Sequence, residues 1–149
     1  MATIGPKVPA SVTELVRTSR AATRKPLYAK LSPATWDIAE SARAVADAGA
    51  DGLSLVNTIR GFAFDRGSGR SALARGAGGS SGPALKPIAL ACVWTCASAV
   101  DLPIVGMGGI VSVQDAIDFV SAGASVLALG TVLFTDPSSP VRIRTGLEA

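Results

Sequence analysis

The sequence of 149 residues contains no histidine and only two cysteines. Histidine is the side chain that most often serves as a general base near neutral pH, so another group must take that role in any catalysis. Cys92 and Cys96 lie four residues apart in a predicted helix and share one face, and two thiols without further ligands do not make a zinc site. We therefore interpret both cysteines as small packing residues and expect no metal site.

Aromatic side chains, clustered charge and long apolar runs are also scarce. Aromatic residues make up 5% of the chain, and its formal net charge of +3 arises without a run of like charges. These features do not indicate a nucleic-acid-binding protein. No apolar run approaches the roughly 20 residues of a membrane-spanning helix, and the first ten residues lack the pattern of a signal peptide. A cytoplasmic protein without membrane or nucleic-acid partners is expected.

The chain is rich instead in short apolar segments separated by amphipathic ones. Hydrophobic residues make up 48% of the sequence, which is typical of a folded domain. The apolar segments predict four strands, at residues 27–31, 53–56, 103–106 and 126–129. The segments around them predict helices, at residues 11–22, 35–48, 83–99 and 113–122. Alternating strands and helices are typical of a parallel sheet built from βαβ units.

Local signals indicate where some helices begin and where regular structure stops. Thr35 is the expected N-cap of the second helix, and the pair Ser112 and Asp115 has the spacing of a capping box. A stretch rich in Gly, Ser and Arg, residues 60–82, has no helical period and predicts a long functional or mobile loop. The tail after Asp136 is expected to add a final helical turn or more.

Two glycine-rich turns that follow the last two strands suggest a phosphate site. The segment Leu102–Ile110, LPIVGMGGI, combines a short strand, a Gly-Gly turn and the approach to a helix. Backbone N–H groups and the positive end of the helix would meet there, which suits a phosphate. Gly-Gly pairs also occur in ordinary turns, but the segment Val126–Thr131, VLALGT, repeats the same arrangement.

Two architectures fit this order of elements, an open doubly wound sheet and a segment of a (β/α)8 barrel. Phosphate-binding turns after the last two strands favour the barrel, in which the loops after strands seven and eight commonly hold a phosphate. A whole barrel needs roughly 200 residues or more. The sequence therefore predicts an α/β fold with four parallel strands alternating with helices, half of a TIM barrel.

Several motifs resemble one known family. The segments are KPLYAKLSP, ADGLSLVNT, GGSSGPALKPIAL, LPIVGMGGI and AGASVLALGT with FTDP. In this order they resemble the C-terminal half of class 1 dihydroorotate dehydrogenases, most closely the type 1B catalytic subunit. The resemblance implies an FMN-dependent TIM barrel that oxidises dihydroorotate to orotate in pyrimidine (UMP) biosynthesis. Residues 1–149 would then be a single partial-barrel, FMN-binding domain without the N-terminal half-barrel.

The resemblance also implies roles for particular residues. Lys30 would lie under the flavin ring, where a cation stabilises the anionic reduced flavin. Asn57 and Thr58 would contact the pyrimidine ring of the substrate. The remaining FMN contacts, including those to the phosphate, would come from Ser81, Gly82, Gly108, Gly109, Gly130 and Thr131.

No catalytic residue follows from the resemblance. In the family, the base that accepts the C5 proton is a cysteine in a loop that precedes the matched region, and neither Cys92 nor Cys96 is in that place. The 149 residues alone are therefore expected to be inactive. Type 1B enzymes pass electrons to NAD through a subunit with FAD and an iron–sulfur cluster, although no motif here selects NAD over fumarate or another acceptor.

Two other interpretations stay open at this stage. The chain could belong to a flavoprotein similar to dihydropyrimidine dehydrogenase, or be a non-catalytic flavin- or phosphate-binding remnant. Half a barrel also has two open strand edges, at residues 27–31 and 126–129, which invite pairing. We therefore expect a homo-oligomer, pairing with a missing half-barrel, or aggregation.

Overall fold

A computed structural model describes residues 10–148 of the chain. The helices and strands occur in the order α1 (Ala10–Ala22), β1 (Tyr28–Leu31), α2 (Ile38–Asp47), β2 (Gly52–Leu55), β3 (Ile59–Gly61), β4 (Gly78–Ser80), α3 (Lys86–Ala97), β5 (Ile104–Met107), α4 (Val113–Ser121), β6 (Val126–Ala128) and α5 (Ser139–Glu148). Two short 3₁₀ helices accompany them, η1 (Pro83–Leu85) before α3 and η2 (Thr131–Phe134) after β6. No helix in this part of the chain is both long and apolar enough to cross a membrane.

The main sheet has four strands in the order β1-β2-β5-β6, and every neighbouring pair is parallel. One register row runs from Lys30 through Ser54 and Val105 to Val126. The strand order follows the chain without reversal, whereas a doubly wound sheet changes direction at a switch point. The predicted α/β fold with four parallel strands is therefore confirmed, and its topology is that of part of a TIM barrel.

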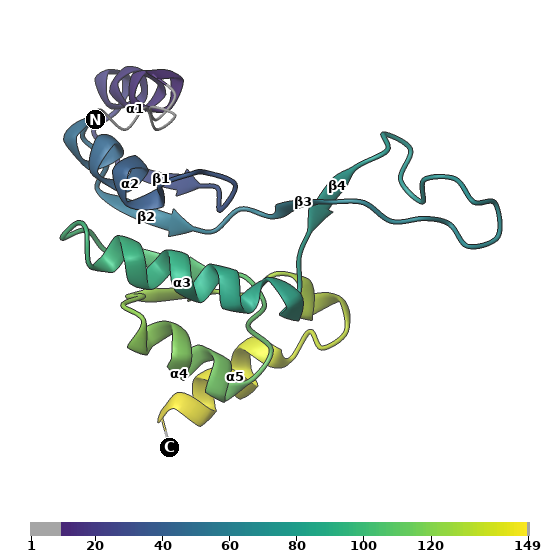
Figure 1. The fold of residues 1–149 in the computed structure, drawn as a ribbon. Coiled ribbons are helices and arrows are strands. Elements are labelled where there is room, and N and C mark those ends of the chain that lie inside the picture. Colours follow the sequence, from purple (N-terminus) through teal and green to yellow (C-terminus); the bar gives the residue numbers. More distant parts are fainter. Residues whose placement is uncertain (1–9, 149) are drawn as a thin grey trace, which may run out of the picture.

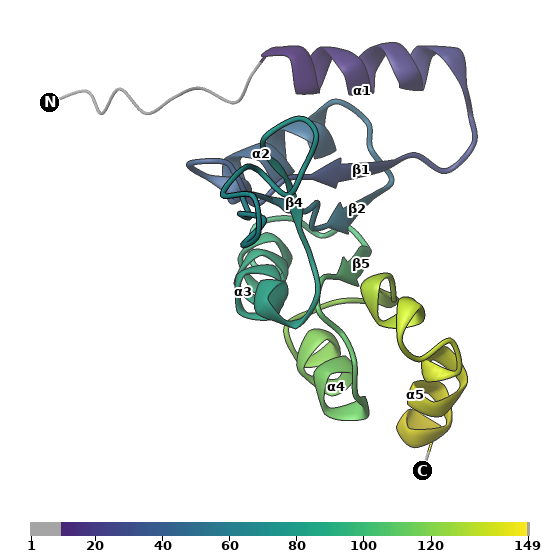
Figure 2. The ribbon, with the colours of Figure 1, turned by 90° about the vertical axis from the view of Figure 1, so that its right-hand side faces the viewer.

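The two faces of the sheet have different environments. Helices α2, α3 and α4 lie along one face (Figures 1 and 2). Most strand side chains on that face are buried, and they form the core with residues of the three helices, including Leu53, Leu55, Ile104, Val45, Val93 and Phe119. On the opposite face, Tyr28 and Lys30 are exposed at strand β1. The second face therefore corresponds to the inner face of a barrel.

Strands β1 and β6 form the two edges of this sheet, as the sequence predicts. Near the β1 edge, Val16 of α1 is buried, and α1 contacts α2. At the other end, α5 packs against α4 through the buried Ile143 (Figure 2). Each edge strand pairs on one side only within residues 10–148, which leaves its other side open.

Two sequence predictions are wrong in detail. Asp37, not Thr35, caps α2, because its carboxylate accepts a hydrogen bond from the backbone N–H of Glu40 at 2.9 Å. A carboxylate also interacts favourably with the positive end of the helix. The segment 60–82 is not simply a loop, because β3 and β4 pair there as an antiparallel hairpin. The expected capping box of α4 is confirmed, with both reciprocal hydrogen bonds between Ser112 and Asp115 present.

Gly106 of β5 allows helix α4 to approach the sheet closely. A Cβ atom at Gly106 would lie 2.8 Å from both Ala124 Cβ and Phe119 Cδ1. We therefore expect Gly106→Ala to lower the free energy of unfolding by about 1–3 kcal/mol through overpacking, measured by urea denaturation.

Gly67→Ala is the matched control, because the nearest atom to a Cβ at Gly67 is Asp65 Oδ1 at an ordinary 3.6 Å. It should leave the urea midpoint almost unchanged. Equal midpoints for the two variants would contradict this account of the packing at Gly106.

Candidate functional site

A cleft lies where the carboxyl ends of the parallel strands meet the loops that follow them. Apolar side chains such as Leu85, Met107 and Leu129 form part of its wall. All of the site residues predicted from the sequence line this one cleft: Lys30, Asn57, Thr58, Ser81, Gly82, Gly108, Gly109, Gly130 and Thr131. Residues as far apart in the chain as Lys30 and Thr131 are thus brought together by the parallel topology.

Lys30 supplies the positive charge of the cleft from the middle of strand β1. Its neighbour in the register is Ser54, whose hydroxyl lies 3.9 Å from the sulfur of Met107. Within residues 10–148, no carboxylate forms an ion pair with Lys30. Its ammonium group is therefore available to an anionic or electron-rich group of a ligand.

Asn57 and Thr58 follow strand β2 and have a firmly held backbone. The N–H of Asn57 donates a hydrogen bond to the carbonyl oxygen of Leu31 at 2.9 Å. The side chain of Thr58 occupies the space that a Cβ atom at Gly79 would need. An amide and a hydroxyl are therefore presented at the cleft, and together they can donate and accept hydrogen bonds.

The loops after β4 and β6 meet across the cleft. The hydroxyl of Thr131 donates a hydrogen bond to the hydroxyl of Ser81 at 2.9 Å. Gly82 is buried beside them with φ +85°, a conformation that glycine adopts without strain. The loop that carries Ser81 is thereby held against the start of η2.

The Gly-Gly turn after β5 lies directly against the start of helix α3. A Cβ atom at Gly109 would be 2.8 Å from the carbonyl oxygen of Gly82 and 3.0 Å from the backbone nitrogen of Lys86. Gly108 and Gly109 both have positive φ, at +124° and +85°. No other residue type could bring the backbone this close in this conformation.

Several backbone donors in these turns have no protein acceptor. Within the described part of the chain, no hydrogen bond is formed by the N–H groups of Gly109, Gly130 and Thr131. Apart from Gly130 and its two chain neighbours, no residue has an atom within 4 Å of the position that a Cβ at Gly130 would occupy. Free N–H groups in glycine-rich turns bind anions, so the arrangement fits a phosphate group.

An ion pair that the sequence analysis missed stabilises the Gly-Gly turn from the side of helices α3 and α4. The Lys86 ammonium lies 2.6 Å from Asp115 and 3.3 Å from Asp118, joining α3 to α4. The second oxygen of Asp115 accepts hydrogen bonds from the N–H groups of Val111 and Ser112 and from the Ser112 hydroxyl, at 2.8–3.0 Å. The capping-box spacing pointed to Asp115 in the sequence, whereas no local pattern pointed to its partner Lys86, which is 29 residues away in the chain.

The charges of this pair shift the pKa of both partners. Burial raises the pKa of Asp115, but the hydrogen bonds from Lys86, Val111 and Ser112 outweigh it and lower the pKa to about 2. The hydrogen bond to Asp115 raises the pKa of Lys86. Both groups are therefore charged at neutral pH, and the turn between β5 and α4 has a fixed conformation.

Both cysteines lie on α3 and neither lines the cleft. Cys96 is fully buried in the core, where burial raises the pKa of its thiol to about 12. Burial also raises the pKa of Cys92. The interpretation of both as packing residues agrees with these positions, because a protonated, buried thiol is a poor nucleophile.

The fold and the cleft define a class of protein before any comparison is made. A segment of a (β/α)8 barrel, with backbone donors at the carboxyl ends of its strands that form no hydrogen bond within residues 10–148, has the arrangement in which TIM-barrel proteins commonly bind a phosphate. The sequence profile of one family, dihydroorotate dehydrogenase, matches residues 5–149. The chain belongs to the dihydroorotate dehydrogenase family.

Individual relatives agree with the family match. The catalytic subunit of dihydroorotate dehydrogenase B (NAD(+)) from Pelobacter propionicus is 49% identical over 140 residues, 94% of this chain and 46% of the relative. The subunit of the same name from Malacoplasma penetrans is 52% identical over 125 residues, 84% of this chain and 41% of the relative. The subunit of the same name from Fusobacterium nucleatum is 46% identical over 143 residues, 96% of this chain and 46% of the relative. The chain thus spans about half the length of these relatives.

The lowered pKa of Asp115 makes a prediction about pH dependence. A carboxyl group with a depressed pKa in the folded state stabilises the protein fully above its unfolded pKa of about 4. That stabilisation decreases as the pH falls through the folded pKa of about 2. We expect Asp115→Asn to cost about 2 kcal/mol of unfolding free energy at pH 7, and roughly half as much at pH 3.

Urea denaturation at the two pH values measures this difference. Asp47→Asn is the control, because Asp47 is exposed on α2 and forms no ion pair within residues 10–148. A cost for Asp115→Asn that is the same at pH 7 and pH 3 would show that the carboxylate charge is not what stabilises the turn.

Proposed function

We propose that this chain provides the FMN phosphate site and part of the substrate site of a dihydroorotate dehydrogenase, an oxidoreductase of pyrimidine biosynthesis. The observation that carries the proposal is the convergence of a lysine, an amide, hydroxyls and free backbone donors in one cleft. The relatives named above, all catalytic subunits of dihydroorotate dehydrogenase B, support the assignment of this activity.

At the phosphate end, the two glycine-rich turns hold the cofactor. The N–H groups of Gly109, Gly130 and Thr131 would donate to the phosphate. The Thr131 hydroxyl, which donates to Ser81 in this structure, would rotate to donate to the phosphate as well. Gly108 lets the first turn lie against α3, and Ser81 and Gly82 form the adjoining wall. The space at Gly130, where no residue beyond its chain neighbours approaches within 4 Å of a Cβ position, is compatible with a bound group.

At the other end of the cleft, Lys30 and the residues after β2 face the reacting groups. FMN, when bound, accepts the two electrons that leave the substrate. The Lys30 ammonium, which forms no ion pair within residues 10–148, would stabilise negative charge on the flavin ring. Asn57 and Thr58 orient the substrate through hydrogen bonds to its pyrimidine ring, since an amide both donates to a carbonyl and accepts from a ring N–H.

The base that accepts the substrate proton is not assigned to any residue of this chain. Cys92 and Cys96 lie on α3 outside the cleft, and their raised pKa values oppose thiolate formation. We propose that residues 1–149 act as one FMN-binding domain that needs a further part of the barrel for turnover. Electrons would leave through a separate electron-transfer subunit with FAD and an iron–sulfur cluster, and NAD would be the acceptor as in the names of the relatives.

The proposal is tested by comparing FMN with riboflavin, which lacks the phosphate. Equilibrium dialysis with flavin fluorescence should show tighter binding of FMN than of riboflavin. We expect Thr131→Val, which keeps the side-chain shape, to weaken FMN binding about tenfold, because one hydrogen bond to a charged group is lost. Riboflavin binding should stay unchanged in this variant.

Two further variants complete the experiment: Lys30→Gln, and a control substitution at an exposed position. Lys30→Gln should make bound FMN harder to reduce, because the cation near the reduced ring is removed, while it leaves the preference for FMN over riboflavin intact. Thr18→Val, on an exposed position of α1, is the control and should bind FMN normally. Equal affinities of the folded protein for FMN and riboflavin would contradict the proposed phosphate site.

The open edges of the sheet generate a separate prediction. Strands β1 and β6 each pair on one side only within the described residues, so we propose that the chain forms homo-oligomers or pairs with another half-barrel. Light scattering should therefore report a mass above that of one 15.0 kDa chain. A monodisperse, folded monomer over a wide concentration range would contradict this prediction.

A further inference from the structure

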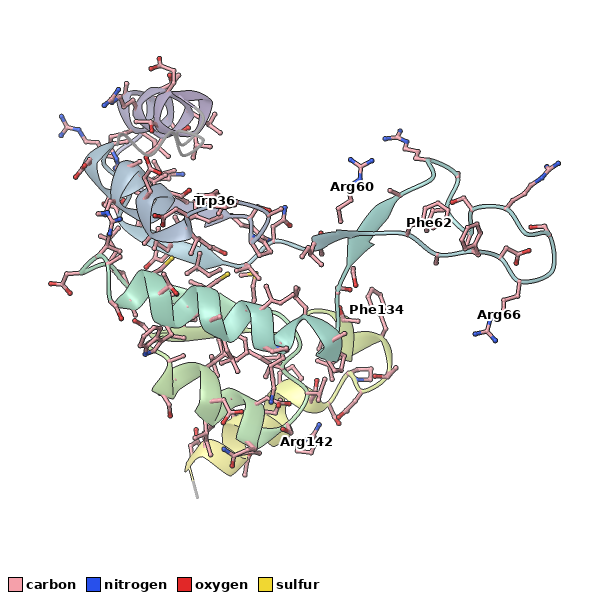
Figure 3. All side chains as sticks on the ribbon, in the orientation of Figure 1. Trp36, Arg60, Phe62, Arg66, Phe134 and Arg142 are labelled. Atoms are coloured by element: carbon pink, nitrogen blue, oxygen red, sulfur yellow. The ribbon has the colours of Figure 1, made fainter. Side chains whose placement is uncertain are left out.

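One side chain of helix α5 connects the two segments that follow β5 and β6. Arg142 lies in the first turn of α5, which Figure 3 shows below the loop that carries Phe134. Its Nη2 donates a hydrogen bond to the carbonyl oxygen of Val111 at 3.2 Å and another to Asp136 Oδ2 at 2.7 Å. Val111 follows β5 and Asp136 follows β6, so a single guanidinium group bridges the two segments.

The bridge holds Val111 at a second point of its backbone. The Val111 N–H donates to Asp115 Oδ2 at 3.0 Å, and its carbonyl oxygen accepts from Arg142. Val111 lines the cleft two positions after Gly109, whose N–H forms no hydrogen bond within residues 10–148. Because peptide groups are planar and rigid, contacts that fix Val111 also restrict the direction of the Gly109 N–H.

Asp136 extends the constraint to the turn after β6. Its N–H donates to the carbonyl oxygen of Val132 at 2.8 Å, and Val132 lines the cleft directly after Thr131. Its Oδ1 accepts from the N–H and the hydroxyl of Ser138 at 3.1 and 2.6 Å. The hydrogen bonds from Ser138 and Arg142 lower the pKa of Asp136, so its carboxylate is charged at neutral pH.

The packing of α5 places Arg142 where it can form this bridge. Ile143, the next residue, is buried. A Cβ atom at Gly146 would lie 2.5 Å from Val113 Cγ2, so α5 lies directly against the start of α4. Arg144 has a different environment, because its side chain is 73% exposed and pairs with Glu148 of the same helix at 3.8 Å.

The exposure of the bridge separates its local effect from overall stability. The side chain of Arg142 is 48% exposed and that of Asp136 is 33% exposed. Ion pairs at the surface contribute little to the free energy of unfolding. Loss of the bridge should therefore change the relative position of the two turns much more than it changes folding.

We propose that Arg142 is a positioning residue for phosphate recognition. Its bridge sets the separation of the two turns, so that the N–H groups of Gly109, Gly130 and Thr131 converge on one phosphate. Arg142 is not among the residues that line the cleft, so it acts through the segments it holds and not by contact with the ligand. The inference rests on the proposed FMN phosphate site.

The test compares the binding of FMN and riboflavin to the chain and to Arg142→Ala by equilibrium dialysis. The ratio of the two affinities should fall about tenfold, because misaligned hydrogen bonds to a charged acceptor are weakened. Riboflavin affinity and the urea midpoint should change little. Arg144→Ala removes the same charge from the same helix, and this matched control should keep the ratio of the unmodified chain.

Asp136→Asn distinguishes positioning from direct attraction between Arg142 and the phosphate. Asparagine keeps an oxygen for Ser138 but presents a donor to Arg142, so the bridge breaks and one negative charge is removed. Positioning predicts weaker FMN binding, whereas direct attraction predicts tighter binding, because a carboxylate near a phosphate repels it. The double variant should lose no more affinity than either single variant, since both changes break one bridge.

Amide hydrogen exchange gives a readout that needs no flavin. Arg142→Ala should speed exchange in residues 108–112 and 130–136 together and leave β2 unchanged, whereas Arg144→Ala should alter neither segment. Equal exchange in the two variants would overturn the proposal.

Two binding results would also overturn it. One is an unchanged preference for FMN in Arg142→Ala, and the other is tighter FMN binding by Asp136→Asn. If the unmodified chain itself fails to distinguish FMN from riboflavin, the proposed phosphate site is contradicted instead, and the exchange measurement decides whether Arg142 positions the two turns.

Discussion

The close contact between the Gly-Gly turn and the start of α3 is the constraint on which the cleft depends. Gly109 lies against the carbonyl of Gly82 and the backbone of Lys86, so the loop after β5 packs directly on the loop after β4. The Lys86–Asp115 ion pair holds the same two segments from the helix side. Backbone donors of the cleft can point at one ligand because these contacts leave the turns no freedom to separate.

The strands and turns of this arrangement could be predicted from local sequence, whereas contacts between residues far apart in the chain could not. The four strands were predictable because each is a short apolar segment, and the Gly130-Thr131 turn was predictable because its glycine closely follows such a segment. The hairpin in 60–82 was missed because glycine and serine give strands no periodic signal, and pairing of β3 with β4 joins distant residues. Asp37 outcompeted Thr35 as a cap because a carboxylate interacts more favourably with the helix end. The partner of Asp115 is also a long-range contact that no local pattern encodes.

The unequal faces of the sheet explain how the fold combines stability with an accessible site. Burial of Leu53, Leu55 and Ile104 beneath the helices provides the apolar core. The other face carries Lys30 and Tyr28 in the open, where a charge avoids the cost of desolvation. In a strand, alternate residues serve the two faces, so the same four-residue segment stabilises the fold and supplies the cleft.

The antiparallel pairing of β3 and β4 has a consequence for how this protein can diverge. The two limbs leave and return at adjacent points, so residues added or removed at the tip do not change the separation between Thr58 and Ser81. Insertions at such exposed tips are tolerated far better than insertions in the sheet. Natural variants can therefore differ in the length and charge of the tip while Thr58 and Ser81, at the base of the hairpin, keep their places beside the cleft.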